Sequence, residues 1–170
     1  YYDSRFKKQW NPLSVISIAI GQGEVLLTPL QIANLGATIA NRGYYITPHV
    51  VKEVKGEALP DSMKVRHYTL ADTTQYKFVA EGMRNAVTGG TCRSANTTMY
   101  EVCGKTGTAQ NPHGQDHSAF MGFAPKNDPK IAICVYVENG GFGATFGGPI
   151  GALMMEQYIN GQLTEASEAK

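Results

Sequence analysis

The sequence predicts an α+β domain in which helices flank an antiparallel β-sheet. Three apolar segments, residues 101–110, 117–124 and 131–138, follow one another closely and are separated by turns rich in Pro, Gly, Asn and Asp. Connections this short favour antiparallel neighbours, because a parallel crossover needs about a dozen residues or more. Segments with helix-capping signals precede and follow the strands, and they provide the helices that cover the sheet.

The bulk composition fits one folded domain with its own core. Apolar residues make up 42% and charged residues 17% of the 170 residues. The net charge of +1 gives no indication of a nucleic-acid partner. The longest apolar run, residues 131–137, is far shorter than the roughly 20 residues that cross a bilayer. Any membrane anchor is therefore expected outside this chain.

The first helix is expected at residues 28–41. Residues 1–12 have no periodicity and are expected to form a loop. Thr28 is a good N-cap, Pro29 fits the first turn, and Gln31 completes a capping box. Gly43 ends the helix. Its apolar face contains Leu30, Ala33, Ala37 and Ala40.

Residues 44–57 predict two short strands or an extended ribbon that turns near Gly56. A second helix follows at residues 72–88, with Asp72 and Gln75 as a capping pair. Its core-facing stripe consists of Tyr76, Val79, Met83 and Val87.

The last helix is expected to begin at Pro149, and residues 164–170 are expected to be frayed. The side chains expected to face inward from this helix are Ile150, Leu153, Met154 and Tyr158.

The tripeptide Gly-Lys-Thr at residues 104–106 raises the question of a phosphate-binding loop. That loop requires G-x-x-x-x-G-K-[ST], which would place a glycine where this sequence has Met99. The residues after Lys105 also read as strand and turn instead of helix. A dinucleotide fingerprint from Gly141 fails in the same way, because its third glycine would fall on Phe146. The glycines after residue 138 therefore predict a loop beside a site.

His113 and His117 have metal-ligand spacing, with Asp116 alongside. Pro112 and Gly114 make this segment a turn, and no further ligand is near, so we expect a solvated hairpin tip. The sequence predicts no metal and no cofactor.

Lys105-Thr106-Gly107-Thr108 has the chemistry of a carboxylate-binding edge strand. Alternation directs Lys105 and Gly107 to one face and Thr106 and Thr108 to the other, unless twist or a bulge at Gly107 tilts them. An edge strand pairs with an extended peptide, and Gly107 leaves room for its approach. A lysine and a nearby hydroxyl suit a terminal carboxylate, and a strand N–H stabilises an oxyanion.

K-T-G is one of three motifs of penicillin-binding proteins and β-lactamases, with S-x-x-K and S-D-N. Here it lies in "GKTGTAQN", within the ordered series "IGQGEVLLTPLQIANLGATIANRG", "TPHVV", "HSAFMGFAP" and "GGFGATFGGPI". Over residues 10 to 162 the sequence resembles the C-terminal half of a class B penicillin-binding protein transpeptidase domain. It is most similar to penicillin-binding protein 2, the elongation type.

The resemblance implies that residues 1–170 are the C-terminal part of one transpeptidase domain, with a partial penicillin-binding-protein/β-lactamase-like fold. Such enzymes cross-link peptidoglycan stem peptides ending in D-Ala-D-Ala through a serine acyl-enzyme, and β-lactams acylate the same serine. The resemblance implies a site at the periplasmic face of the bacterial inner membrane, beside a membrane glycosyltransferase of the elongation machinery.

The resemblance also implies the roles of the strand residues. Lys105 positions the carboxylate and supports proton movement, and Thr108 supplies a backbone N–H to the oxyanion and a hydroxyl to the carboxylate. These two are the expected catalytic residues. The expected substrate-binding residues are Thr106, Gly107 and Gln110.

Two of the three catalytic motifs are expected to be absent. Ser4-Arg5-Phe6-Lys7 is a literal S-x-x-K, but it lies too close to K-T-G and outside any helical pattern. Ser94-Ala95-Asn96 resembles S-x-N, but it follows the "IGQG" region where the family has it before. We therefore expect this chain alone to be inactive, to expose an apolar patch and to associate with itself or another fragment.

Two alternatives stay open from the sequence. One is a non-catalytic sensor that binds β-lactam or muropeptide, and the other is a D,D-carboxypeptidase or β-lactamase relative. An S-x-x-K serine upstream of this chain would distinguish a catalyst from a sensor. Among the cysteines, Cys134 is expected to be buried, and pairing of Cys92 with Cys103 stays open.

Overall fold

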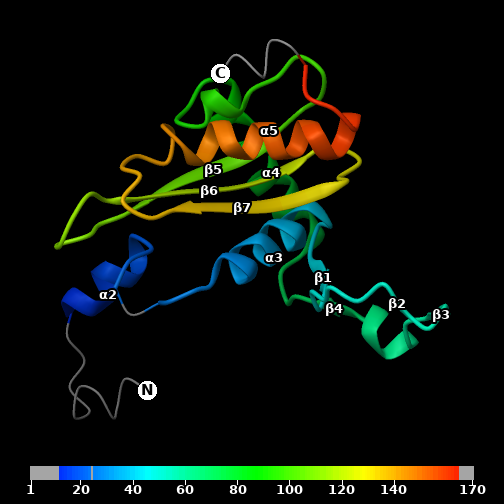
Figure 1. The fold of residues 1–170 in the computed structure, drawn as a ribbon. Helices are drawn as coiled ribbons and strands as arrows, with labels where there is room; N and C mark the ends of the chain where they lie inside the picture. The colour runs from blue at the N-terminus through cyan, green and yellow to red at the C-terminus, as the bar shows by residue number, and fades with distance from the viewer. Residues whose placement is uncertain (1–11, 24, 165–170) are drawn as a thin grey trace.

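The structure is a computed structural model that describes residues 12–23 and 25–164. Its centre is a three-stranded sheet of β5 (Cys103–Ala109), β6 (His117–Ala124) and β7 (Ile131–Val137), in the order β5-β6-β7 and antiparallel throughout. Helix α5 (Gly147–Asn160) lies on one face of this sheet, and α3 (Pro29–Ala40) lies on the other (Figure 1). The predicted α+β class is confirmed.

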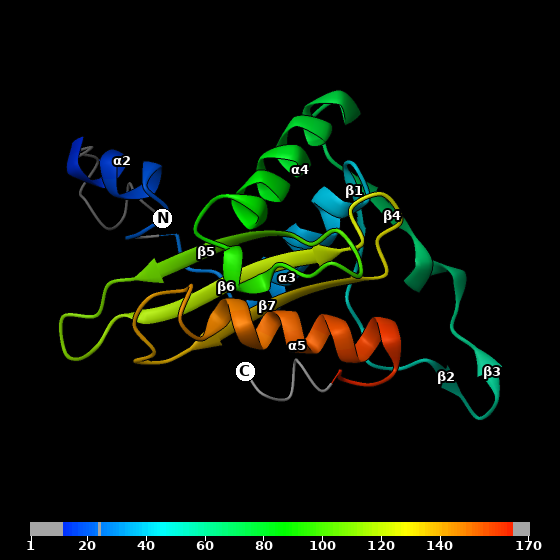
Figure 2. The ribbon, with the colours of Figure 1, turned by 90° about the horizontal axis from the view of Figure 1, so that it is seen from above.

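Two buried clusters lie on the two faces of the sheet. The cluster on the α5 face includes Phe120, Val135 and Met155, and the cluster on the α3 face includes Ile39, Cys103 and Phe123. Helix α4 (Thr73–Thr88) runs beside β5 in Figure 2. This helix contributes to both clusters, Met83 to the α3 face and Val87 to the α5 face, because it passes the edge of the sheet at the start of β5.

The predicted capping signals are confirmed for α3 and partly for α4. The Gln31 N–H donates to Thr28 Oγ1 at 3.3 Å, and the Thr28 N–H donates to Gln31 Oε1 at 2.8 Å, which completes the capping box. At α4, the Asp72 carboxylate accepts hydrogen bonds from the backbone N–H and the hydroxyl of Thr74, whereas the Gln75 N–H donates to the Asp72 backbone carbonyl instead. These two bonds hold the pKa of Asp72 below its ordinary value of 3.8.

The segment before α4 contains more and shorter elements than the sequence predicted. Strand β1 (Tyr44–Ile46) pairs with β4 (Arg66–Tyr68), and β2 (Glu53–Val54) forms a hairpin with β3 (Glu57–Ala58). The turn at Gly56 is confirmed, and these strands form two separate two-stranded sheets that do not pair with the main sheet. Three further elements were not predicted: helix α2 (Pro12–Ala19) and the 3-10 helices η1 (Asp61–Lys64) and η2 (Arg93–Ala95).

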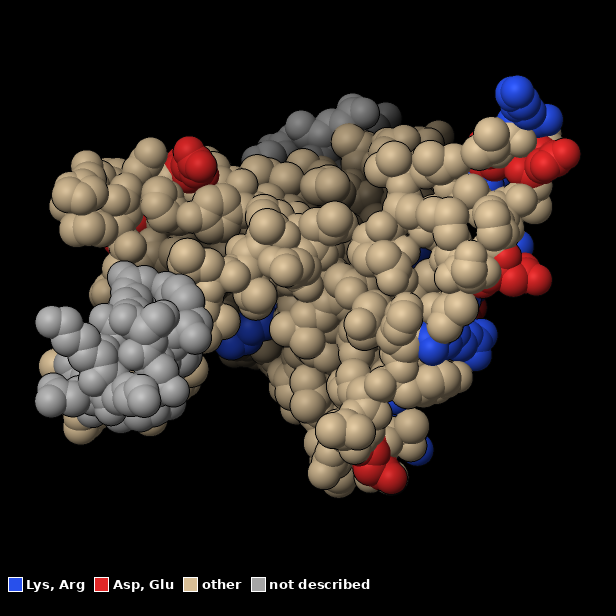
Figure 3. Space-filling model, turned by 90° about the horizontal axis from the view of Figure 1, so that it is seen from below, with Lys and Arg blue, Asp and Glu red and all other residues tan. Residues whose placement is uncertain are grey.

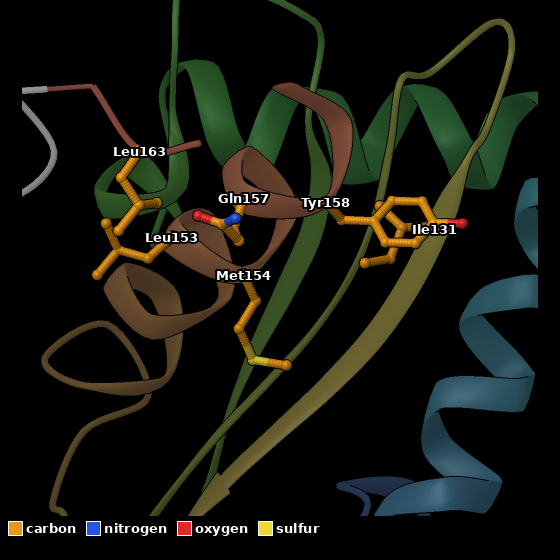
Figure 4. Close-up of a pocket in the computed structure, with 6 residues that line it drawn as sticks. All are labelled: Ile131, Leu153, Met154, Gln157, Tyr158 and Leu163. Carbon is orange, nitrogen blue, oxygen red and sulfur yellow. The ribbon is translucent and has the colours of Figure 1, made fainter. Parts of the chain in front are cut away.

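The predicted inward face of the last helix is wrong. Helix α5 begins at Gly147, and Gly151 lies so close to the sheet that a Cβ there would be 2.6 Å from a ring carbon of Phe120. The large side chain that points into the core from this helix is Met155, whereas Ile150, Met154 and Tyr158 are exposed and Leu153 is half-buried. An apolar hollow of about 650 Å³ lies beside β7 (Figure 4), formed by Ile131, Leu153, Met154, Gln157, Tyr158 and Leu163.

A second exposed apolar surface lies on α2, α3 and their connection. Figure 3 shows that charged side chains are sparse over the middle of this side and more frequent towards β2 and β3. Leu26 is 84% exposed and Leu30 is 61% exposed, so Leu30 does not join the buried face of α3. The other large apolar side chains exposed here are Leu13, Val15, Ile16, Ile20, Val25, Leu27 and Leu35. Within the described residues, no helix combines the length and apolarity needed to cross a membrane.

All three cysteines are free thiols in the structure. Cys92 belongs to the cluster on the α5 face and Cys103 to the cluster on the α3 face, so the sheet separates them. Burial raises the pKa of the Cys103 thiol to about 11, which keeps it protonated and weakly nucleophilic at neutral pH. Cys134 is half-buried, not fully buried as predicted.

Candidate active-site strand

Strand β5 is an edge strand, as the sequence predicted. In the sheet order it neighbours only β6, and Figure 2 shows its outer side facing α4. Cys103 and Gly104 are buried beneath α4, whereas Lys105 is exposed and Thr106 to Ala109 are half-buried. The strand therefore becomes accessible at the point where the Lys-Thr-Gly-Thr sequence begins.

The β5–β6 ladder is continuous, so no bulge at Gly107 alters the alternation of side chains. The register pairs Lys105 with Met121, Gly107 with Ala119 and Thr108 with Ser118. Lys105 lies on the α3 face, because its partner Met121 packs on the α3-face cluster. Thr106 and Thr108 lie on the α5 face. The structure thus brings Lys105 and Thr108 onto one edge strand, but their side chains leave from opposite faces.

Backbone geometry indicates which residues direct polar groups to the free edge. A Cβ placed on Gly143 would be 2.5 Å from the carbonyl oxygens of both Gly107 and Ala119, so these two oxygens lie close together between the strands. That proximity is expected for a hydrogen-bonded antiparallel pair. Alternate residues then face away from β6, and we infer that Thr106 and Thr108 direct their N–H and C=O groups to the edge.

The position of the Lys105 ammonium agrees with this inference. Lys105 Nζ donates a hydrogen bond to the carbonyl oxygen of Thr106 at 2.7 Å. The ammonium therefore lies along the strand near the free edge, although the side chain starts on the α3 face. A positive charge and outward N–H groups on one strand edge suit an anionic, extended ligand.

Packing requires a glycine at position 104, the first residue of the Gly-Lys-Thr tripeptide. A Cβ at this position would be 2.6 Å from a ring carbon of Phe120, so only glycine fits beside the buried ring. The tripeptide lies within a β-strand, and no helix follows it to hold a phosphate. The structure is therefore consistent with the exclusion of a phosphate-binding loop.

The glycine-rich loop between β7 and α5 packs against this strand. Gly143 occupies the close position described above, and its Cβ would also be 3.0 Å from Thr106 Cβ. Two serine hydroxyls hold the loop by donating to backbone carbonyls: Ser118 Oγ to Phe142 at 3.1 Å and Ser94 Oγ to Ala144 at 3.0 Å. The loop therefore packs against Thr106 and Gly107 on the α5 face of the strand.

Thr106 has a hydroxyl partner from another segment. Thr91 Oγ1 and Thr106 Oγ1 lie 2.8 Å apart, within hydrogen-bond distance. Thr91 belongs to the segment that follows α4, so this contact joins that segment to the centre of the Lys-Thr-Gly-Thr strand. Gln110, the last expected substrate-binding residue, is exposed just beyond the end of β5.

The rejected motifs have other roles or fall outside the described residues. Ser94 lies in η2 and its hydroxyl is used to hold the glycine-rich loop. Ser4-Arg5-Phe6-Lys7 lies outside the described residues. His117 begins β6, and its Nδ1 accepts the Asn139 N–H at 3.0 Å. In the described part of the chain, no group of three or more His, Cys, Asp or Glu side chains is placed to hold a metal.

Sequence reasoning missed Ser118. It is fully buried on β6, its hydroxyl donates to Phe142 and accepts from the N–H of Gly147 at 3.1 Å, and it is the register partner of Thr108. The only available signal was a serine within an otherwise apolar strand. The partner groups are backbone atoms of a distant loop, which sequence patterns do not identify.

Comparison with known proteins identifies one family over most of the chain. A profile of the penicillin-binding protein transpeptidase domain matches residues 3–158. Peptidoglycan D,D-transpeptidase MrdA of Haemophilus influenzae is 31% identical over 96% of this chain.

Solved structures give the same result for the fold. Penicillin-binding protein 2 of Pseudomonas aeruginosa, in complex with WCK 5153, has a TM-score of 0.81 and 34% identity over 97% of this chain. Penicillin-binding protein A of Mycobacterium tuberculosis, as a ceftriaxone acyl-enzyme, has a TM-score of 0.73 and 32% identity over 84%. The chain spans 28% of the H. influenzae relative and 37% of the P. aeruginosa chain.

Proposed function

This chain belongs to the penicillin-binding protein transpeptidase family, and from that premise we propose that residues 1–170 are the C-terminal part of a peptidoglycan D,D-transpeptidase domain. The complete enzyme cross-links stem peptides through a serine acyl-enzyme and is acylated by β-lactams at the same serine. This part supplies the Lys-Thr-Gly-Thr strand, and the remainder of the enzyme supplies the nucleophile and the S-x-N residues.

The observation that carries the proposal is the accessible edge of β5 from Lys105 onward. A stem peptide that lies antiparallel to this edge pairs with the outward backbone groups of Thr106 and Thr108. Gly107 adds no side chain on the approach, and packing within the protein does not require this glycine, because a Cβ there would meet only Ala119 Cβ at 3.4 Å. The terminal carboxylate then meets the Lys105 ammonium and the hydroxyls of Thr106 and Thr108, and Gln110 contacts the peptide beyond the end of the strand.

The catalytic roles follow from the same arrangement. The Thr108 N–H points to the edge and donates to the oxyanion that develops when the serine attacks the D-Ala-D-Ala carbonyl. The Lys105 ammonium stabilises negative charge beside the nucleophile and supports proton movement to the leaving D-alanine. Each interaction becomes stronger as charge develops, so each favours the transition state over bound substrate.

The setting proposed for the complete enzyme is the periplasmic face of the bacterial inner membrane. Its substrates there are stem peptides that end in D-Ala-D-Ala, and its partner is a membrane glycosyltransferase of the elongation machinery. The relatives named as peptidoglycan D,D-transpeptidases support the peptidoglycan substrate in this proposal.

Intact-mass spectrometry after exposure to benzylpenicillin tests the proposal. The full-length protein is expected to gain one drug mass, and the 170-residue chain alone is expected to gain none, because it lacks the nucleophile. Failure of the full-length protein to form the adduct would overturn the proposal. A stoichiometric adduct on Ser94 in the short chain would overturn the motif assignment instead.

Release of D-alanine distinguishes the enzyme from a sensor. The full-length protein is expected to release D-alanine from a pentapeptide substrate and to transfer the acyl group to an added amine. Acylation by benzylpenicillin without any turnover of peptide would favour a β-lactam or muropeptide sensor.

A further inference from the structure

A buried hydroxyl directly behind Thr108 connects the proposed active-site strand to the glycine-rich loop and to α5. Ser118 is the register partner of Thr108, and both side chains lie on the α5 face of the sheet. Because Thr108 faces away from β6, this is a non-hydrogen-bonded pair, the type in which opposing side chains lie closest. Ser118 is 0% exposed, and Thr108 is half-buried between it and the free edge.

Both hydrogen-bonding functions of the Ser118 hydroxyl are used. The hydroxyl donates to the carbonyl oxygen of Phe142 at 3.1 Å and accepts from the N–H of Gly147 at 3.1 Å. Gly147 is the first residue of α5, and the N-cap residue Phe146 has no side-chain acceptor for the free N–H groups of the first turn. Ser118 therefore caps α5 from a neighbouring strand and holds the start of the loop with the same oxygen.

The two ends of the segment 142–147 are thus hydrogen-bonded to one oxygen atom, and its second residue packs against the active-site strand. Gly143 lies against the carbonyl oxygens of Gly107 and Ala119, with no room for a Cβ. The Gly148 N–H donates back to the Gly143 carbonyl at 3.0 Å. Removing the Ser118 hydroxyl leaves the buried Gly147 N–H without its acceptor and the partly buried Phe142 carbonyl without this donor, at the two points that hold the loop against the strand.

We propose that Ser118 is a positioning residue for the acyl-transfer reaction: its hydroxyl holds the segment 142–147 against β5 and so fixes the backbone of Thr108 at the free edge. The proposal rests on the function proposed above. Ser118 does not touch substrate. It acts through the loop and through Thr108, whose N–H is the proposed oxyanion donor, so its contribution appears in the acylation step.

Stopped-flow acylation by nitrocefin, measured with the full-length protein well below its melting temperature, tests the proposal. Ser118→Ala is expected to lower the first-order acylation constant by about tenfold or more, because misplaced oxyanion donors lose transition-state stabilisation. The dissociation constant of the non-covalent complex is expected to change much less, since the affected interaction is made mainly in the transition state. Ser118→Thr keeps the hydroxyl and is expected to retain most of the wild-type rate.

Val135→Ala is the matched control. Val135 lies in the same buried cluster on the α5 face but is not among the residues that hold the loop. This variant is expected to lose stability and to acylate at the wild-type rate while folded. Hydrogen exchange at residues 142–147 gives a second readout, and it is expected to accelerate in Ser118→Ala but not in Val135→Ala.

The outcomes separate the two proposals. If the wild-type protein does not acylate, the proposed function fails. If the wild-type protein acylates and folded Ser118→Ala matches it, Ser118 has only a structural role and the positioning proposal is overturned. Should Ser118→Ala fail to fold, Ser118→Cys decides, because it keeps the shape while its thiol is a weak hydrogen-bonding group. A wild-type acylation rate in that variant would also overturn the proposal.

Discussion

Gly143 lies so close to Gly107 that a Cβ atom on Gly143 would stand 2.5 Å from the Gly107 carbonyl oxygen. The contact joins the loop that precedes α5 to the middle of the proposed active-site strand. Both partners are backbone, and neither can move aside as the end of a flexible side chain can. Any side chain at position 143 would push the loop away from the strand, so this close contact requires glycine.

Gly143→Ala is expected to destabilise the protein by about 1–3 kcal/mol, because the new methyl group overpacks against two carbonyl oxygens. Urea unfolding measures the change. Gly82→Ala is the matched control, since a Cβ at Gly82 in α4 meets nothing within 4 Å. The control is expected to stabilise the protein by about 0.5–1 kcal/mol through helix propensity. Equal effects of the two substitutions would contradict the packing argument.

Gly104→Ala is expected to destabilise through the Phe120 ring, which occupies the place of its side chain. A double-mutant cycle with Phe120→Leu checks the cause. The smaller residue relieves the clash, so the double variant is expected to be more stable than the sum of the single effects by about 0.5 kcal/mol or more. Additive effects would show that the ring is not the obstacle.

Lys105→Met is expected to lower β-lactam acylation of the full-length protein by about a hundredfold or more, because it removes the ammonium that stabilises developing negative charge. The side chain is exposed, so the unfolding free energy is expected to change by less than about 0.5 kcal/mol. Lys130→Met is the control, because it removes another exposed lysine that lies outside the strand. Lys130 Nζ forms an ion pair with Asp128 Oδ2 at 2.6 Å. An equal loss of acylation in both variants would exclude a specific role for Lys105.

The Asp72 cap gives a pH dependence of defined sign. Hydrogen bonds from Thr74 lower the pKa of Asp72 in the folded state below 3.8. The carboxylate therefore contributes stability above its unfolded pKa, and this contribution is lost as the pH falls through the folded pKa. Circular dichroism melts are expected to lose less stability on acidification for Asp72→Asn, which keeps a neutral cap, than for the wild type. Identical pH profiles would mean that the cap contributes nothing measurable.

The 170-residue chain is expected to self-associate through the exposed apolar surface of α2, α3 and their connection. Sedimentation velocity should show a weight-average mass that rises with concentration. Leu26→Glu combined with Leu30→Glu, at two exposed positions of this surface, is expected to shift the chain towards monomer. Leu70→Glu changes an even more exposed leucine outside this surface and is expected to have no effect. A compact wild-type monomer at all concentrations would refute the expectation.

Local signals predicted most of the elements correctly. The Thr28–Gln31 capping box, the glycine turn at Gly56 and the three strands after residue 101 each depend on neighbouring residues, so the sequence contains the information. The pairing of β1 with β4 was missed, because it joins segments separated by the β2–β3 hairpin. Pairing at such a distance depends on tertiary packing instead of local pattern.

The edge position of the Lys-Thr-Gly-Thr strand was predicted correctly, but the contacts that support this strand were missed. The edge position of Lys105 and Thr108 followed from strand spacing and from the glycine between them. Ser118 and Thr91 were missed, because each acts on backbone or hydroxyl groups from a distant part of the chain. The glycine loop beside the site was predicted, but not the backbone contact that Gly143 makes with the strand. The outward turn of Met154 and Tyr158 was missed for a related reason, since amphipathic spacing cannot reveal that glycines form the closest helix–sheet contact.

The Phe120 ring lies against three glycines, at positions 104, 122 and 151, from both strands of the ladder and from α5. Substitution at any of them meets the same aromatic obstacle, whether or not the protein turns over substrate. Selection on folding alone would therefore preserve the glycine that precedes Lys105 in a descendant that had lost its chemistry. In a gene copy that has lost its activity, replacement of the lysine would indicate that loss. Retention of the glycine would indicate only that the protein still folds.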